Sequence, residues 1–206
     1  MRFSSRGHIL FFGDSITDAG RDRARPDDLG QGYVRAIASH FSQGDASGGP
    51  RLTNRGVSGN RIYDLEERLE RDVLDLRPSL VSILIGINDT WRLFDSGVAS
   101  PPAEFQASYR RILERLRGAG CEVVILEPFL LPVPDDRRAW RADVDARIAV
   151  IRELAWEFRT PYLPLDGLFA AAAVETGPAH WLPDGVHPSP VGHALIAARW
   201  LELVQA

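Results

Sequence analysis

The sequence contains no lysine, and all 24 of its basic residues are arginine. This absence excludes catalysis through a Schiff-base lysine, a Ser–Lys dyad or the lysine of a phosphate-binding loop. Any nucleophile in this protein therefore has to be activated by another kind of group. The arginine-rich stretches at 21–25 and 137–141 are expected to be solvated faces or subunit contacts.

Cysteine occurs once, at position 121, so the chain can form no intrachain disulfide. Cys121 opens an apolar run and is expected to pack as a small core residue. No apolar run approaches the length that a transmembrane helix needs. The apolar run near the start of the chain is also too brief for a signal peptide. We therefore expect a cytoplasmic protein that has no membrane partner.

The chain also lacks a large excess of charge of either sign, since its formal net charge is only -4. A surface of the basic kind that binds nucleic acid is therefore not indicated. Hydrophobic residues make up 45% of the chain and charged residues 25%, which is typical of a globular protein. A length of 206 residues fits one domain, which we expect to span 1–206.

Five short runs rich in Val, Ile, Leu or Phe are predicted to be β-strands. Most are apolar throughout rather than alternating, which suits strands buried on both faces of a parallel sheet. Between them lie segments whose apolar residues fall on one helical face. The strands are predicted at 8–12, 51–54, 80–85, 122–126 and 161–165, and the helices at 31–41, 62–76, 103–116, 140–158 and 190–204. This alternation predicts βαβ units in a three-layer α/β/α sandwich.

Small polar residues follow the predicted strands. Ser15 comes after the first strand, Gly59 after the second and Asn88 after the third. The carboxyl ends of parallel strands lie at one edge of the sheet, where such folds bind ligands. Asp184 and His187 follow the fifth strand and precede the last helix, so they can return to the same edge. These five residues are therefore predicted to form one site.

Their side chains suit acyl transfer. The hydroxyl of Ser15 needs a base, and His187 can take its proton while Asp184 holds the other ring nitrogen. The tetrahedral intermediate carries an oxyanion, for which the candidate donors are the N–H groups of Ser15 and Gly59 and the side-chain amide of Asn88. The chain has no G-x-S-x-G elbow. This argues against the α/β-hydrolase fold, whose serine depends on that turn.

Four blocks of the sequence resemble the signature blocks of the SGNH (GDSL-type) hydrolases, and they occur in the order of that family. They are Gly13-Asp14-Ser15, Gly59, Gly86-x-Asn88-Asp89 and Asp184-x-x-His187. The resemblance implies the SGNH hydrolase fold, a flavodoxin-like sandwich with a five-stranded parallel sheet in the order 2-1-3-4-5. It also implies ester hydrolysis without a metal or other cofactor. By position it assigns Ser15, His187 and Asp184 as the triad, and Gly59 and Asn88 as oxyanion donors.

Longer segments around these blocks are similar to intracellular acetylxylan esterases, which remove acetyl groups from xylo-oligosaccharides. This likeness implies a small acetylated sugar as substrate and suggests a homo-oligomer. Trp91 and Arg92 follow Asn88, and Trp181 precedes Asp184, so these side chains and Asp14 are candidates for contact with the sugar. The loops at 95–102 and 132–136 depart from the pattern and could reshape the pocket.

Several candidates also have an alternative interpretation. Arg92 could form a salt bridge instead of contacting a substrate hydroxyl. Asp14 and Asp89 could bond to backbone N–H groups around the serine loop, and Asn54 could brace the site. His187, His193 and Asp184 could hold a metal, although His193 fits better as a helix residue.

Two other functions remain open beside the deacetylase. The same scaffold could serve a lysophospholipase, thioesterase or arylesterase, which would need an apolar tunnel for the acyl chain. A sugar-binding module without activity could also keep this fold. The complete set of nucleophile, base, carboxylate and oxyanion donors speaks against the last interpretation.

Overall fold

The computed structural model describes residues 7–44 and 49–205 and contains a parallel sheet of five strands. The strands lie in the order β2-β1-β3-β4-β5, as the resemblance implied. They are β1 (His8–Gly13), β2 (Arg51–Gly56), β3 (Leu80–Leu84), β4 (Glu122–Leu126) and β5 (Tyr162–Leu163). Four of the five therefore follow the predicted runs closely, while β5 is much shorter than its run.

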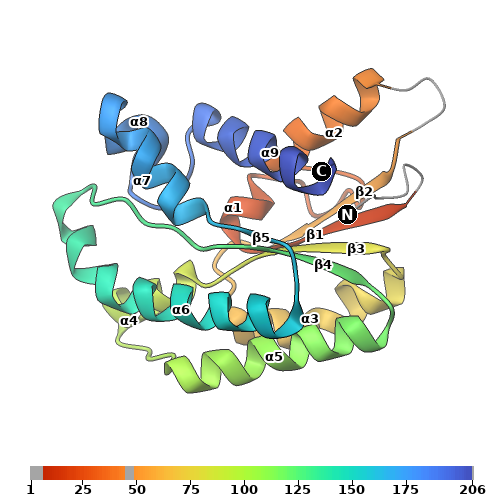
Figure 1. The fold of residues 1–206 in the computed structure, drawn as a ribbon, viewed down its shortest axis with the longest axis horizontal. Coiled ribbons are helices and arrows are strands. Elements are labelled where there is room, and N and C mark those ends of the chain that lie inside the picture. The colour runs from red at the N-terminus through yellow and green to blue at the C-terminus, as the bar shows by residue number, and fades with distance from the viewer. Residues whose placement is uncertain (1–6, 45–48, 206) are drawn as a thin grey trace.

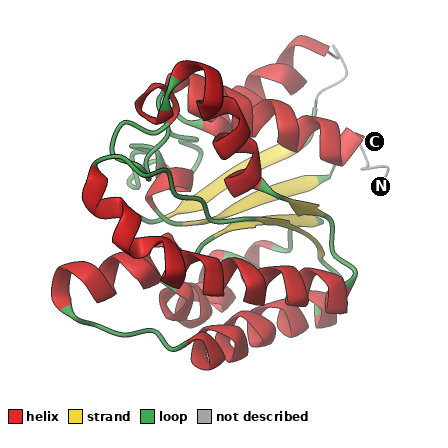
Figure 2. Cartoon of the chain, turned by 60° about the vertical axis from the view of Figure 1, so that its left-hand side comes forward, coloured by secondary structure: helices red, strands yellow, loops and turns green. Residues whose placement is uncertain are grey.

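Helices cover both faces of the sheet, which gives three layers (Figure 1). Figure 2 shows the same arrangement from another side, with the strands lying between two groups of helices. The α-helices are α1 (Ser15–Asp18), α2 (Tyr33–Gly44), α3 (Ile62–Asp72), α4 (Ile87–Ser96), α5 (Pro102–Gly118), α6 (Arg141–Phe158), α7 (Leu165–Thr176), α8 (Pro178–Trp181) and α9 (Pro190–Gln205); two 3-10 helices are η1 (Leu74–Leu76) and η2 (Asp135–Trp140).

The strands are apolar throughout because each of their faces packs against a different core. Along β1, Ile9 and Phe11 point into the core shared with α2, α7 and α9. Leu10 and Phe12 alternate with them and point into the core shared with α3, α5 and α6. This alternation is the two-residue period of a strand, expressed between two apolar layers instead of one apolar layer and water.

One polar group in the sheet is buried without loss of its hydrogen bond. Ser82 in β3 is fully buried, and its hydroxyl accepts a hydrogen bond of 3.0 Å from the indole N–H of Trp200 in α9. Trp200 also packs at 5.3 Å from the ring of Phe11. A buried polar atom costs stability unless it has such a partner, and here the bond fixes the last helix on the sheet.

No helix in the described ranges is both long and apolar enough to cross a membrane.

Gly13 ends β1 at the point where the chain turns into α1. A Cβ atom there would lie 2.4 Å from the carbonyl oxygen of Leu84 and 2.4 Å from the hydroxyl of Thr17. The strand β3 and the first turn of α1 can approach each other this closely only because the position has no side chain. The placement of Ser15, two residues later, thus depends on a glycine at position 13.

We predict that Gly13→Ala lowers the free energy of unfolding by about 1–3 kcal/mol, because the backbone around the added methyl has to move. Gly167→Ala is the matched control, since Gly167 lies in α7 with nothing within 4 Å of its Cβ position. The control should gain about 0.5–1 kcal/mol from helix propensity. Urea unfolding of both variants measures the difference, and equal stabilities would contradict the prediction.

Candidate active site

Ser15 is the first residue of the short helix α1, directly after the turn that ends β1. Asp14 caps this helix, because its side chain accepts a hydrogen bond of 3.0 Å from the N–H of Ile16. The cap fixes the direction of the first turn. Because Ser15 follows the end of β1, it lies at the carboxyl edge of the sheet. The residue is half-buried, so a substrate can reach it.

The hydroxyl of Ser15 meets the ring of His187, although 172 residues separate them in the sequence. The distance from Oγ of Ser15 to Nε2 of His187 is 2.9 Å. On the other side of the ring, Nδ1 lies 2.7 Å from Oδ2 of Asp184. The three side chains therefore form a continuous hydrogen-bonded chain. Its order and distances are those by which a base activates a serine.

Asp184 is held in place by the backbone of the loop that it begins. Its Oδ1 accepts hydrogen bonds from the N–H groups of Val186 at 3.0 Å and His187 at 2.7 Å. The carboxylate thus orients both the backbone and the ring of His187, and the sequence spacing of three residues permits this.

The candidate oxyanion donors lie on the two neighbouring segments of the same edge. Gly59, in the loop between β2 and α3, has a φ of +84°, a conformation that favours glycine. Asn88 lies in the first turn of α4, and its side-chain amide donates a hydrogen bond of 3.0 Å to the carbonyl of Asn60. That bond joins the two segments and uses one of the two N–H groups of the Asn88 amide.

Asn54 braces the loops around Ser15, as one interpretation of the sequence expected. Its Nδ2 donates to the carbonyl groups of Thr17 at 2.7 Å and Leu29 at 2.9 Å. Its Oδ1 accepts from the N–H of Gly56 at 2.8 Å. Asn54 is fully buried, so all three bonds form away from water and tie β2 to the end of α1.

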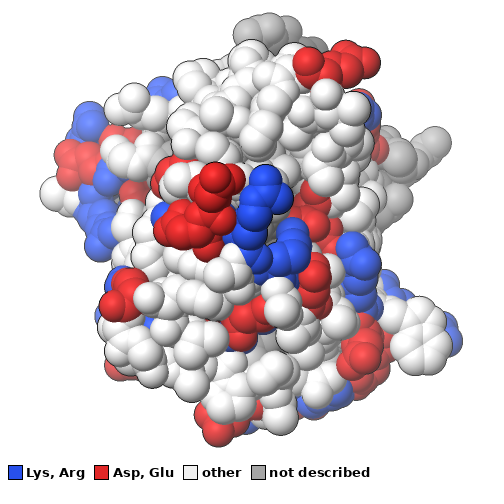
Figure 3. All heavy atoms as spheres, turned by 90° about the vertical axis from the view of Figure 1, so that its left-hand side faces the viewer, with Lys and Arg blue, Asp and Glu red and all other residues white. Residues whose placement is uncertain are grey.

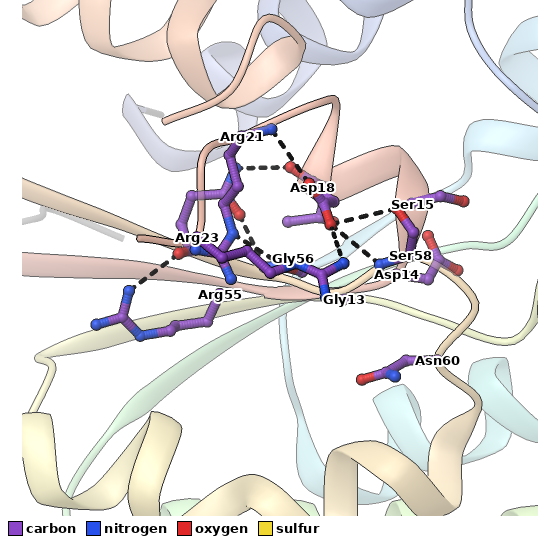
Figure 4. A network of polar contacts seen from close by, with 12 residues as sticks. Gly13, Asp14, Ser15, Asp18, Arg21, Arg23, Arg55, Gly56, Ser58 and Asn60 are labelled. Atoms are coloured by element: carbon purple, nitrogen blue, oxygen red, sulfur yellow. Dashed lines mark hydrogen bonds and ion pairs between the residues drawn. The ribbon is translucent and has the colours of Figure 1, made fainter. Parts of the chain in front are cut away.

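Asp18 is a second brace, to which the sequence analysis gave no role (Figure 4). Its Oδ2 accepts hydrogen bonds from the backbone and the hydroxyl of Ser58 and an ion pair of 2.7 Å from Arg23. Because Asp18 is the last residue of α1, it connects the serine helix to the segment that carries Gly59. The motif Gly-Asp-Ser-Ile-Thr-Asp contains this residue, but its partner in the second block cannot be read from spacing.

The sequence of most of the chain matches a known family. The profile of the GDSL-like lipase/acylhydrolase family matches residues 11–195. The chain belongs to this family. As an acylhydrolase of the GDSL (SGNH) type it is a carboxylic ester hydrolase.

Curated and solved relatives agree with the family match. An acetylxylan esterase of Geobacillus stearothermophilus is 32% identical over 211 residues, which cover 98% of this chain and 95% of that protein. Its crystal structure aligns with a TM-score of 0.88 and 31% identity over 98% of this chain and 95% of that one. A GDSL-like lipase from Parabacteroides merdae has a TM-score of 0.90 and 35% identity, with 98% of each chain covered.

Other solved forms of the Geobacillus enzyme describe its chemistry more closely. One is named an acetyl-xylooligosaccharide esterase. Two are catalytic mutants, one with a histidine and one with a serine replaced by alanine.

In this acylhydrolase, Asp14 does not have the place that a substrate contact needs. The side chain is fully buried, and one of its oxygens caps α1. Asp14 thus makes the bond to the serine loop that its alternative interpretation described, and it stays outside the substrate site proposed below. Burial raises the pKa of Asp14 to about 7, against the hydrogen bond from Ile16 and the charge of His187, which lower it.

Asp89 is also buried, but it acts on a different segment from the serine loop. Its two oxygens accept hydrogen bonds from the N–H of Ile62 at 3.2 Å and the hydroxyl of Ser100 at 3.0 Å. It therefore holds the start of α3 against α4. Burial raises its pKa to about 6, and the positive charge of Arg147 is the main opposing influence.

Trp91 lies beside the catalytic histidine candidate, with ring centroids 5.9 Å apart. Its other neighbour is Trp140, whose ring packs edge-on at 5.1 Å. The guanidinium of Arg137 covers both indoles, at 4.9 Å from the Trp91 ring and 4.0 Å from the Trp140 ring. Trp91 therefore lies between the ring of His187 and the side chains of Arg137 and Trp140.

Arg137 differs from the expectation that the stretch 137–141 is a solvated face or a subunit contact. Its side chain is only 12% exposed. Its Nε donates a hydrogen bond of 3.2 Å to the carbonyl of Asp184. It thus connects the aromatic pair to the loop of the acid and the base.

Trp181 lies in α8 and is turned towards α7. Its indole N–H donates to the carbonyl of Ala172 at 3.1 Å and to the hydroxyl of Thr176 at 2.7 Å. Its ring packs edge-on against Phe169 at 6.5 Å. Since its polar atom and ring are engaged by α7, we leave Trp181 out of the proposed substrate site.

His193 packs as the helix residue that the sequence favoured over a metal ligand. It lies near the start of α9, where its Nδ1 accepts a hydrogen bond of 3.2 Å from the N–H of Tyr33. Its ring stacks on the ring of Tyr33. Burial, and then the charge of His187, lower the pKa of His193 to about 4.

The electrostatics of the Asp184–His187 pair favour the charged imidazolium. The hydrogen bond that the ring of His187 donates to Asp184 raises the pKa of His187 above its ordinary value, although partial burial opposes this. Burial raises the pKa of Asp184, but hydrogen bonds from the ring and backbone of His187 outweigh it and bring that pKa well below its usual range. Each partner thus stabilises the charged form of the other.

We predict that the apparent pKa of His187, followed by NMR of its ring nitrogens, lies above the ordinary value of 6.5. In Asp184→Asn it should fall, because the carboxylate that stabilises the imidazolium has gone. His193 is the internal control, since its pKa of about 4 is set first by burial. If the pKa of His187 is the same in Asp184→Asn as in the unmodified protein, the ion pair with Asp184 does not set it.

Proposed function

We propose that the enzyme removes O-acetyl groups from small acetylated sugars, xylo-oligosaccharides or sugars related to them. The observation that carries the proposal is the hydrogen-bonded chain from Ser15 through His187 to Asp184. The acetyl group and the sugar are supported by the similar Geobacillus enzyme, which is named an acetyl-xylooligosaccharide esterase. Catalytic mutants of that enzyme replace a serine and a histidine, the two residue types at the centre of this site.

In the first half of the reaction, Oγ of Ser15 attacks the acetyl carbonyl carbon while Nε2 of His187 accepts the hydroxyl proton. The carbonyl oxygen becomes an oxyanion that faces the N–H groups of Ser15 and Gly59 and the amide of Asn88. The intermediate then collapses, and the C–O bond to the sugar breaks. His187 returns its proton to the departing sugar oxygen, which leaves an acetyl group on Ser15.

In the second half, a water molecule loses a proton to His187 and attacks the acetyl carbonyl of the acyl-enzyme. The bond to Oγ of Ser15 breaks, His187 reprotonates that oxygen, and acetate leaves. Asp184 keeps Nδ1 of His187 protonated, so that Nε2 faces the serine as an acceptor. His187 serves as a base only in its neutral form, which becomes populated as the pH rises through its raised pKa.

We predict that Ser15→Ala lowers kcat for acetate release from acetylated xylo-oligosaccharides by at least about a thousandfold, because the nucleophile is lost. Ser39→Ala is the matched control, since the hydroxyl of Ser39 in α2 is exposed and bonds to the carbonyl of Arg35 in its own helix. Thermal unfolding verifies that both variants remain folded. Full activity in a folded Ser15→Ala protein would rule out this mechanism.

Acyl-chain length separates the deacetylase from the lysophospholipase, thioesterase and arylesterase alternatives. We predict that kcat/KM for p-nitrophenyl esters falls steadily from acetate to octanoate, since the proposed substrate carries only a two-carbon acyl group. The series is measured on one preparation at constant pH. A maximum at about eight carbons or more would instead assign the enzyme to long acyl chains, whose burial contributes about 0.8 kcal/mol for each CH₂ group.

A further inference from the structure

Helix α4 leads from the candidate oxyanion site to the surface of the molecule. Its first residues, 87–90, are buried, and Asn88 bonds to the carbonyl of Asn60. The next residues, 91–93, are half-buried, and residues 94–96 are exposed. The helix therefore begins beside the reacting ester and ends in water. Its side chains can therefore contact a substrate that extends from the site towards the surface.

Four polar or aromatic side chains lie on one face of this helix. Asn88, Trp91, Arg92 and Asp95 have the spacing i, i+3, i+4 and i+7, which places them in a row. With a rise of 1.5 Å for each residue, the row is about 10 Å long. It therefore extends well beyond an acetyl group, and the ester chemistry accounts only for its inner end.

Arg92 connects the inner and outer parts of the row. Its Nη1 forms an ion pair of 2.7 Å with Asp95. Its Nη2 lies over Gly59, 3.4 Å from the position that a Cβ atom would occupy there. The guanidinium and the carboxylate are both partly exposed, at 42% and 32%. They offer N–H donors and carboxylate acceptors next to each other, which suits the hydroxyl groups of a sugar.

An aromatic surface extends from Trp91 along the side of this row. Trp91 lies next to His187, and Trp140 packs against Trp91. Phe94 then stacks on Trp140, with centroids 5.5 Å apart and an interplanar angle of 20°. Trp140 is buried, whereas Phe94 is 43% exposed. The ring of Phe94 is thus exposed to solvent and supported by Trp140. It lies one helical turn farther from the ester than Trp91.

The charge on this end of the molecule suits a neutral ligand. Figure 3 shows basic and acidic side chains lying close together among uncharged ones, without a field of one sign. An extended anion or cation would meet both signs there. A sugar has an apolar C–H face that can lie on an aromatic ring and hydroxyl groups that can bond to paired charges.

We propose that the outward half of α4 is a subsite for the second sugar unit of an acetylated oligosaccharide, with Phe94 under the ring and Asp95 bonded to its hydroxyls, while Arg92 holds Asp95 and lies towards the acetylated unit. The proposal rests on the proposed function. It makes α4 a determinant of substrate length: the acetylated unit lies at Trp91 and the neighbouring unit at Phe94. Oligosaccharides should therefore be deacetylated more efficiently than acetylated xylose.

The test compares kcat/KM for acetate release from acetylated xylotriose with kcat/KM for acetylated xylose. In Phe94→Ala the ratio of the two values should fall by about threefold to tenfold, mainly through a higher KM for xylotriose, which is the size of one aromatic contact. Asp95→Asn should also lower the ratio, because it weakens the pair that bonds to the hydroxyls. An unchanged ratio in both folded variants overturns the proposal.

Two control variants separate the subsite from general damage. Phe94→Tyr keeps the ring and should keep the ratio. Trp156→Ala removes an aromatic residue of α6 that is 85% exposed, and should also keep the ratio. If Phe94→Ala depresses both substrates equally, the ring only supports Trp140, and the subsite is rejected.

Two further outcomes would overturn the proposal for other reasons. If Phe94→Ala changes the oligomeric state in analytical ultracentrifugation, the exposed ring is a contact between copies of the chain. If the unmodified enzyme cleaves p-nitrophenyl acetate but releases acetate from neither sugar, the proposed function itself fails. That failure differs from the case in which both sugars are substrates and the substitutions leave their ratio unchanged.

Discussion

The hydrogen bond between Ser15 and His187 sets the requirement that the rest of the architecture meets. It joins the first strand connection of the chain to the loop before the last helix, across 172 residues. A parallel sheet can meet such a requirement because all its strands end at one edge. The two apolar cores fix the order of the strands, and the bond between Trp200 and Ser82 fixes the last helix on them. The polar site thus depends on the apolar packing beneath it.

Most of the fold could be predicted because strands and amphipathic helices leave periodic patterns. The exceptions have local causes. The run at 161–165 contains Pro161 and Pro164, which have no N–H to donate, and only Tyr162 and Leu163 join the sheet. Helix α7 was not predicted, since its run of alanines makes no apolar stripe. Helix α4 was also not predicted, because its buried start is polar and its exposed end carries Phe94.

The central residues of the candidate site were predicted from local spacing and from the shared edge of a parallel sheet, whereas the contacts that brace them were missed. The spacing of Asp184 and His187 was enough to suggest their bond. The capping role of Asp14 was considered, but its complete burial could not be read from the motif. No spacing links Asp18 to Ser58, or Arg137 to Asp184, because each pair meets only after the sheet has formed.

The loop that bears Asp184 and His187 has no strand of its own to support it. It is held by the segment after β4: the N–H of Leu131 donates to the carbonyl of Gly185 at 2.9 Å, and Arg137 donates to the carbonyl of Asp184. A side chain at Gly185 would meet the carbonyl oxygens of Leu131 and Val133 at 2.6 Å and 2.3 Å. Two irregular segments thus lie in direct contact, and a sequence change in either one alters the positions of Asp184 and His187. The segment after β4 therefore cannot vary in shape independently of the Asp184–His187 pair that it holds.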